Sequence, residues 1–531
     1  MSQQKPSRTL AAIAGIVAAA TLISKIFGLV RTQAMAAAFG VGDAVNAYNY
    51  AYVIPGFFWV LLGGINGPFH TAVVSVIAKR NQEEAAPLVE TITTLVGGVL
   101  LLVSIGLIIF ADFFIHLVGP GLNHTAHAIA IQQLQFMAPM AVLAGLTGIG
   151  FGTLNAANQY WLLSLSPLFS SITVIGGLGI LAMQLGSDIT RSYYAQLGGL
   201  VLAWGTLVGA ILQWLVQVVA QSRAGMGNFR LRFDFNQSGV QEVIKLMVPA
   251  TFSSGMMQIN VYTDLFFASY IPGAAAAFNY ANLIVQTPLG IISNVILLPL
   301  LPMLSRLADP ADWANLKVRI RQGLLLTAVT MLPLGALMVA LASPIVRIVY
   351  ERYAFKQSDS RLVTSVLIAY GIGMFVYLGR DVLVRVFYAL GDGHTPFRIS
   401  MVNIFLNALL DYILVKPFGA PGLILATVGV NLTSMVMLLW LLDRKLNGLP
   451  WQEWIWPILG LSGGSFVAGL ASWGTFWGCQ QISATEGMLV QLLQLCLSGL
   501  VGTTVFALIA MRLNLPEVDI FVSRLRQRFV K

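Results

Sequence analysis

Charged residues are scarce in this sequence, since Asp, Glu, Lys and Arg together make up only 10% of its 531 residues. Soluble globular domains carry about 25%, so these few charges cannot cover the water-exposed surface of a chain of this length. Aromatic residues also reach 10%, which excludes a disordered chain. The composition therefore excludes a soluble enzyme and predicts a protein embedded in a membrane.

Cysteine is nearly absent as well, with only Cys479 and Cys496 in the whole chain. Two cysteines are too few for a disulfide framework or for a Cys-based metal site. Both fall in apolar segments, and we expect both to be small buried hydrophobic residues. The sequence also lacks a nucleophile–base motif and a glycine-rich phosphate loop, so we expect a protein that is not an enzyme.

Long apolar runs dominate what is present. A membrane-spanning helix needs about 20 mostly apolar residues, whereas outer-membrane barrels alternate polar and apolar residues in short segments. The sequence predicts an all-α polytopic membrane protein with fourteen transmembrane helices. We place them at residues 9–38, 45–78, 87–117, 126–154, 161–186, 194–221, 240–271, 276–305, 321–348, 362–390, 397–415, 420–442, 453–476 and 485–511.

The basic residues are distributed asymmetrically between these runs. If the N-terminus is cytoplasmic, nineteen of the 30 Lys and Arg residues fall in cytoplasmic segments and six in outer segments. The positive-inside rule favours this orientation, with both termini cytoplasmic. It also explains the net charge of +9 without nucleic acid as a partner. We expect the basic, amphipathic residues 514–531 to lie on the inner membrane surface.

The chain repeats itself at an offset of 230 residues. Residues 47–54 read AYNYAYVI and residues 277–284 read AFNYANLI. Six expected spans separate the two copies, so both copies have the same orientation, as in transporters with parallel repeats. We expect a six-helix N-lobe at 1–222, a six-helix C-lobe at 223–445, two further helices at 446–513 and a tail at 514–531.

Ionisable residues inside spans are expensive and usually face a cavity or a partner. In the first span Lys25 and Arg31 flank Gly28, and an arginine offers the fork of donors that phosphate oxygens accept. Because they lie about 120° apart on a regular helix, both reach one cavity only if the helix bends near Gly28. Snorkelling to the membrane interface is the alternative. In the tenth span we expect Asp381 and Arg385 to pair with each other.

A second set of polar residues offers mainly oxygen atoms. Asn403, Asn407 and Asp411 follow a spacing of four and so share one helix face. Asp264 lies in the seventh span and Thr427 in the twelfth. Hard cations prefer oxygen ligands, and sodium-coupled transporters hold such ions between helices. We predict a cation or proton site, with interhelical hydrogen bonding as the alternative.

Three segments resemble signatures of the MurJ/MviN family of lipid II flippases. They are residues 24–31 (SKIFGLVR), 298–305 (LPLLPMLS) and 387–396 (FYALGDGHTP). The resemblance covers nearly the whole chain and includes the family's fourteen spans. It implies a two-lobed exporter fold, a cationic central cavity for a lipid-linked pyrophosphate, and a groove for the lipid tail formed by the last two spans.

The resemblance also implies roles for individual residues. Lys25 and Arg31 fall at two of the family's basic cavity positions, and Asn282 stands where the family has an arginine. We expect Asn49 and Asn279, which occupy equivalent positions in the two copies of the repeat, to contact the substrate together with Lys25, Arg31 and Asn282. Some family members bind sodium at the positions of Asp264, Asn407, Asp411, Thr427 and the backbone carbonyl of Leu423.

Together these observations predict a flippase of the bacterial inner membrane. We expect it to move a polyprenyl-pyrophosphate-linked saccharide, lipid II for peptidoglycan synthesis, outward by alternating access, driven by sodium or by the membrane potential. We expect a monomer surrounded by membrane lipids, with other cell-wall synthesis proteins as further partners. Two alternatives stay open: a cation-coupled exporter of small amphiphiles, and a non-transporting membrane scaffold for envelope synthesis.

Overall fold

The computed structural model describes residues 10–64, 68–77, 80, 82–157, 161–228, 230–256, 258–482 and 487–513. Every regular element in these ranges is helical: nineteen α-helices and three short 3-10 helices. The described ranges contain no β-strand. The predicted all-α class is therefore confirmed. The predicted basic tail at 514–531 lies outside the described residues.

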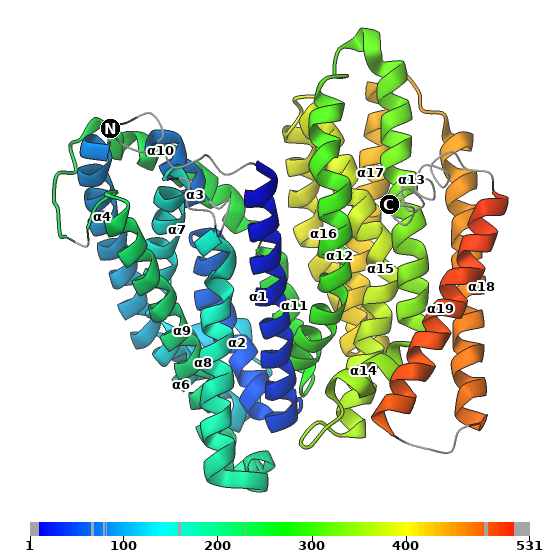
Figure 1. Cartoon of the computed structure of the whole chain (residues 1–531), viewed down its shortest axis with the longest axis horizontal. Helices are drawn as coiled ribbons and strands as arrows, with labels where there is room; N and C mark the ends of the chain where they lie inside the picture. The colour runs from blue at the N-terminus through cyan, green and yellow to red at the C-terminus, as the bar shows by residue number, and fades with distance from the viewer. Residues whose placement is uncertain are drawn as a thin grey trace. The chain divides into compact units, whose positions relative to one another are not determined.

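Contacts between the helices divide the chain into two compact units (Figure 1). The first unit holds the described residues up to Ala276 and also Arg352–Phe355. Its elements are α1 (Leu10–Phe39), α2 (Asp43–Leu61), α3 (Pro68–Ile77), α4 (Gln82–Ile109), α5 (Ala111–Val118), α6 (His124–Met137), α7 (Met140–Ala156), α8 (Trp161–Leu185), two 3-10 turns (Gly186–Thr190 and Ser192–Tyr194), α9 (Ala195–Arg223), α10 (Ser238–Met256) and α11 (Ile259–Ala268).

The second unit comprises Ala277–Glu351 and the described residues from Lys356 onward. Within it α15 packs on α13 and α17, α17 packs on α16, and the pair α18–α19 packs on α13. Its elements are α12 (Ala274–Ser305), a 3-10 turn (Pro310–Asp312), α13 (Trp313–Ala340), α14 (Ala342–Tyr350), α15 (Gln357–Ala389), α16 (His394–Phe418), α17 (Ala420–Lys445), α18 (Trp451–Ile482) and α19 (Met488–Arg512).

Eleven helices of the described residues are long and apolar enough to cross a membrane, or twelve if α6 and α7 form one bent span. A multi-span membrane protein is therefore confirmed. The remaining predicted spans each contain two shorter helices: α2 with α3, α6 with α7, and α10 with α11. The bend of 42° between α6 and α7 lies at Pro139, since proline removes a helical hydrogen bond. The count of fourteen spans stays a prediction.

The order and length of the helices repeat along the chain in step with the sequence repeat. A 28-residue helix followed by a short helix occurs as α4–α5 and again as α13–α14. Two helices of 25 residues, α8 and α16, follow at corresponding places. This agreement supports the parallel repeat, and the lobe limits at 222 and 445 remain our hypothesis for its boundaries.

Helix α7 forms the centre of the first unit, because it contacts α2, α3, α4 and α9 and is buried along nearly its whole length. Small residues allow these close approaches, as in other membrane helices. A side chain at Gly148, for example, would run into the backbone carbonyl of Leu62. The first unit is therefore packed around a helix that has no lipid-facing side.

The segment 387–396 joins the ends of three helices of the second unit. Gly391 has a φ of 72°, and the Asp392 N–H donates to the carbonyl of Phe387 at 2.9 Å. Helix α15 therefore ends in a left-handed conformation that favours glycine. Asp392 then accepts hydrogen bonds from Thr395 in the first turn of α16. At the end of α17, Lys445 Nζ donates to Asp392 Oδ2 at 2.7 Å. The conformation thus explains the glycine at position 391, the aspartate at position 392 and the threonine at position 395.

Asp392 lies between the membrane-spanning segments of α15 and α16. Partial burial raises the pKa of its carboxyl, but the hydrogen bonds and charge of Lys445 and the hydrogen bonds from Thr395 outweigh burial. The pKa of Asp392 falls to about 2. The carboxylate is thus ionised at every physiological pH.

Two expectations about single residues need correction. Cys479 is half-buried, but Cys496 is exposed on α19. The expectation that both are buried was therefore wrong: Cys479 is only partly covered, and α19 presents apolar residues outward, where Cys496 behaves as another small apolar residue. Asp381 forms its ion pair with Arg380, at 3.1 Å, not with Arg385. The long arginine side chain allows this pair even though adjacent residues do not face each other on a helix.

Candidate functional site

Arg31 is half-buried on α1, the helix that packs against α8. Its Nη1 donates to Ser170 Oγ of α8 at 3.4 Å, while its buried Nε has no hydrogen-bond partner. Tyr48 and Tyr52 of α2 lie close enough to interact electrostatically with the guanidinium. Other arginines of the described ranges form ion pairs, namely Arg80, Arg191, Arg232, Arg347 and Arg380. The Arg31 guanidinium therefore keeps donors that an anionic ligand can use.

Lys25 lies in a different environment from Arg31. It is exposed, and α1 runs through Gly28 as one helix without a break. The carbonyl of Gly28 accepts a hydrogen bond from Thr32 Oγ1 at 2.9 Å. The structure therefore leaves Lys25 and Arg31 on different faces of α1 and shows no break at Gly28 that would bring them together.

The three asparagines expected at the substrate lie in α2 and α12. Asn49 is half-buried and donates from Nδ2 to the carbonyl of Val45, one turn earlier, at 2.8 Å. Asn279 is exposed and Asn282 is half-buried. Asn49 and Asn279 each lie in the second turn of their helix, so the sequence repeat extends to their structural position.

Four of the five expected cation ligands lie on α16 and α17. These two helices run antiparallel: Asn403 Nδ2 donates to Ser434 Oγ at 2.5 Å, and further along Gly422 lies directly against the backbone of Leu414. The expectation that Asn403, Asn407 and Asp411 share a face is confirmed, since all three are buried. That face is turned toward α17.

Asn407 and Asp411 occupy the stretch of α16 between these two crossing points. Both are fully buried, and Asn407 Nδ2 donates to Asp411 Oδ2 at 2.7 Å. On the opposing stretch of α17, Thr427 Oγ1 donates to the carbonyl of Leu423 at 3.2 Å. The interface thus gathers a carboxylate, an amide, a hydroxyl and a backbone carbonyl, the oxygen types that hard cations bind.

Asp264, the fifth expected ligand, is half-buried on α11. This helix belongs to the first unit, whereas the other four residues belong to the second. Helix α11 has only ten residues and packs on α5. Asp264 therefore sits on a short, separate helix.

Several buried polar contacts were not predicted from the sequence. Tyr48 Oη and Thr206 Oγ1 are 2.8 Å apart, linking α2 to α9. Gln133 of α6 is fully buried and donates to the carbonyls of Ala44 and Gly199 at 3.2 and 2.9 Å. The presence of Gln and Tyr within apolar runs was the available signal, but their partners lie on distant segments of the chain.

The family model for the lipid II flippase MurJ matches residues 35–495 of this chain. The chain belongs to this family. A probable lipid II flippase MurJ from Synechocystis sp. is 57% identical over 527 residues, which cover 99% of this chain and 98% of that protein. The resemblance drawn from the three sequence segments is confirmed. Since MurJ proteins are transporters, membership also confirms the expectation of a protein that is not an enzyme.

Two solved structures support the fold of the MurJ family for this chain. A lipid II flippase MurJ in an inward closed conformation aligns with a TM-score of 0.74 at 24% identity, covering 93% of this chain and 98% of that one. An inward-facing multidrug resistance transporter of the MATE family aligns with a TM-score of 0.59 at 15% identity, covering 82% and 98%. The predicted exporter fold is confirmed by both.

Proposed function

We propose that this protein is a flippase that moves lipid II, the lipid-linked precursor of peptidoglycan, outward across the bacterial inner membrane. The observation that carries the proposal is its family membership, with 57% identity to a probable lipid II flippase over 99% of the chain. The scarcity of charge and the eleven or twelve apolar helices of the described residues agree with a carrier that works inside the membrane.

Arg31 is the residue we expect to engage the pyrophosphate. Its Nε is buried and makes no hydrogen bond, and its contact with Ser170 is long, at 3.4 Å. Phosphate oxygens accept the paired donors of a guanidinium, so the ligand would complete the hydrogen bonding of this side chain. Asn49, on α2 of the same unit as Arg31, would contribute a weaker polar contact to the headgroup, whereas Lys25 lies on another face of α1 and would not reach it. Asn279 and Asn282 of α12 stay expected substrate contacts from the second unit.

We further propose that sodium, or the membrane potential, resets the carrier after each transport step. Asp411, Asn407, Thr427 and the carbonyl of Leu423, all in the second unit, would hold the ion. Asp264 stays an expected ligand on the first unit. A fully buried carboxylate is costly unless a proton or a cation offsets its charge, which agrees with the burial of Asp411. A potential of 100 mV acting on one charge supplies about 2.3 kcal/mol.

For orientation we propose that both termini are cytoplasmic, as the distribution of basic residues favours. We also propose that the carrier is a monomer and that its main partners are its cargo and the surrounding lipids. Other cell-wall synthesis proteins would meet it at the membrane surface.

A reconstituted transport assay tests the proposed function. The purified protein is placed in liposomes with labelled lipid II in the inner leaflet, and the appearance of label in the outer leaflet is followed. A second polyprenyl pyrophosphate with another saccharide measures headgroup selectivity, and protein-free liposomes give the background. We expect lipid II to move well above background. Equal rates with and without protein would overturn the proposal and favour the alternative of a non-transporting membrane scaffold for envelope synthesis.

A further inference from the structure

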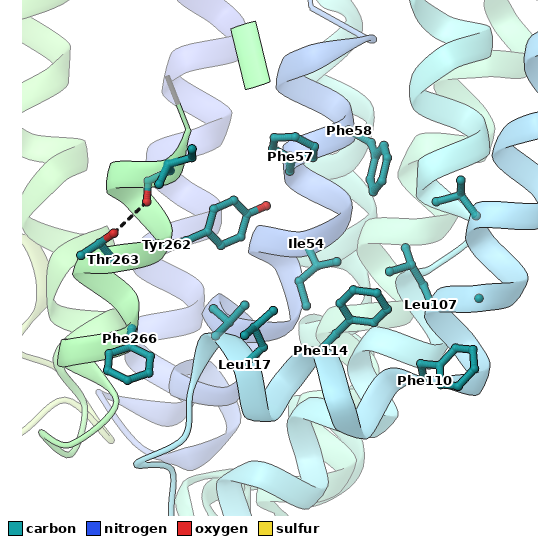
Figure 2. Close-up of a pocket in the computed structure, with 14 residues that line it drawn as sticks. Ile54, Phe57, Phe58, Leu107, Phe110, Phe114, Leu117, Tyr262, Thr263 and Phe266 are labelled. Atoms are coloured by element: carbon teal, nitrogen blue, oxygen red, sulfur yellow. Dashed lines mark hydrogen bonds between the residues drawn. The ribbon is translucent and has the colours of Figure 1, made fainter. Parts of the chain in front are cut away.

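The first unit contains a cavity of about 710 Å³ that is separate from the polar residues described above. Four helices form its wall: α2, α4, α5 and α11. Figure 2 shows Tyr262, Thr263 and Phe266 of α11 on one side of the cavity. Phe110 and Phe114 lie on the other side. The cavity is therefore a property of the first unit alone.

The wall of this cavity is apolar and rich in aromatic rings. None of its fourteen lining residues is charged, and side-chain oxygens come only from Tyr262 and Thr263. Both hydroxyls are directed to backbone carbonyls: Thr263 Oγ1 to Ile259 at 3.1 Å and Tyr262 Oη to Val53 at 3.5 Å. An internal water needs two to four polar partners, which this wall does not supply. A hydrocarbon ligand fits its chemistry instead.

The rim of the cavity continues into the apolar surface of a membrane-spanning helix. Phe110 and Leu117 line the cavity and are 59% and 58% exposed. On α4, Leu102 and Ile109 are 71% and 67% exposed, and α4 is one of the helices able to cross a membrane. Such a surface is bathed by lipid acyl chains, so the medium at the rim is itself hydrocarbon.

From these observations we infer that the cavity is a binding site for one acyl chain of a membrane phospholipid. An empty cavity of this kind forfeits the dispersion contacts of its lining. Its volume is nearly five times that of a dry cavity of about 150 Å³ that accepts benzene, which leaves room for an extended chain. The bound chain would fill the space beside α11, the short helix that carries Asp264.

Two glycines of α4 provide a matched pair of variants. A side chain at Gly106 would project into the cavity, because Gly106 lines it and no atom lies within 4 Å of a Cβ built there. Gly98 on the same helix also has nothing within 4 Å, but it is exposed and does not line the cavity. Gly106→Phe would therefore fill the cavity, while Gly98→Phe adds the same bulk outside it.

The test uses the full-length protein in nanodiscs that contain phosphatidylglycerol with a photoreactive diazirine at the end of one acyl chain. After illumination, mass spectrometry locates the labelled residues. We expect labelling of cavity residues such as Phe57 and Phe266, reduced at least fivefold by Gly106→Phe and unchanged by Gly98→Phe. Labelling of the exposed Leu102 reports contact with bulk lipid and should stay constant in both variants.

Three results would overturn the inference. The first is labelling of Leu102 without labelling of the cavity residues in the native protein. The second is equal labelling of the cavity in the Gly106→Phe variant. The third comes from a parallel arm with a diazirine-bearing polyprenyl phosphate: stronger labelling of the cavity by this probe would assign the site to a prenyl chain instead of an acyl chain.

Discussion

Asn407 and Asp411 lie one turn apart on α16 and are joined by a hydrogen bond of 2.7 Å from Nδ2 to Oδ2. Both side chains are fully buried against α17. The amide therefore orients the carboxylate inside the helix pair, out of reach of solvent. A carboxylate held in this way requires a positive charge nearby or a proton of its own.

The first prediction concerns that requirement. If sodium occupies the α16–α17 interface, sodium should raise the melting temperature of the purified protein more than potassium at equal ionic strength. A ligand at 100 times its dissociation constant stabilises the folded state by about 2.7 kcal/mol. Asp411→Asn should abolish the difference between the two salts, as measured by thermal unfolding in detergent.

Asp381→Asn is the matched control for this experiment. Asp381 is another carboxylate in a membrane-spanning helix of the same unit, but it pairs with Arg380. This variant should keep the sodium effect. Identical melting temperatures of the native protein in sodium and potassium, from millimolar to several hundred millimolar salt, would refute the site and favour a protonated carboxyl.

The second prediction concerns the anion site. Arg31→Ala should reduce lipid II transport in liposomes about 10- to 100-fold, because hydrogen bonds to charged groups are worth roughly 1.5 to 3 kcal/mol. Arg31→Lys should restore part of the rate, since an ammonium supplies charge without the paired donors. Lys25→Ala should have a smaller effect, because Lys25 is exposed on another face of α1. Normal transport by Arg31→Ala would exclude the anion site.

The third prediction concerns orientation in the membrane. Ser192→Cys and Asp234→Cys, each in a background in which Cys479 and Cys496 are replaced by Ala, place a thiol at exposed positions of two loops. An impermeant maleimide added to intact cells should label position 192 and leave position 234 unlabelled until the membrane is opened. The reverse pattern would contradict cytoplasmic termini.

The sequence alone was sufficient to predict some features because they depend on local spacing. The four-residue spacing from Asn403 to Asp411 placed these side chains on one face before any partner was known. The contacts of Arg31 could not be predicted in this way, since Ser170 lies 139 residues away and the Tyr48 ring approaches from a third helix. Packing between distant segments decides such contacts.

Breaks in helices were also difficult to predict from hydropathy. An apolar run indicates that a segment lies in the membrane, but it does not show where the helix within it ends. The predicted span 240–271 contains α10 and α11, and Asp264 lies on the second of these helices. The segment 387–396, in contrast, was singled out by its sequence, and Gly391 and Asp392 account for that sequence through the helix ends they form.

The last prediction concerns the ion pair between Asp392 and Lys445, whose Oδ2 and Nζ atoms are 2.7 Å apart. The carboxyl and the ammonium side chains are 21% and 34% exposed, so solvent screens part of their attraction. Asp392→Asn should lower the free energy of unfolding by about 1 kcal/mol at neutral pH. Lys445→Gln should have a similar effect, and the double variant should lose less than the sum of the two. Chemical denaturation in detergent micelles measures all three.

The pH dependence of the Asp392→Asn effect separates this ion pair from a purely steric role. The pKa of Asp392 is about 2 in the folded protein, below its ordinary value of 3.8, so the folded state favours the ionised form. The stabilisation is therefore complete above about pH 4 and is lost as the pH falls from 3.8 toward 2. Asp392→Asn should cost the same at pH 7 and pH 5, and progressively less below pH 4. A cost that stays constant down to pH 2.5 would show that the carboxylate charge contributes nothing and that the substitution acts through the shape of the turn.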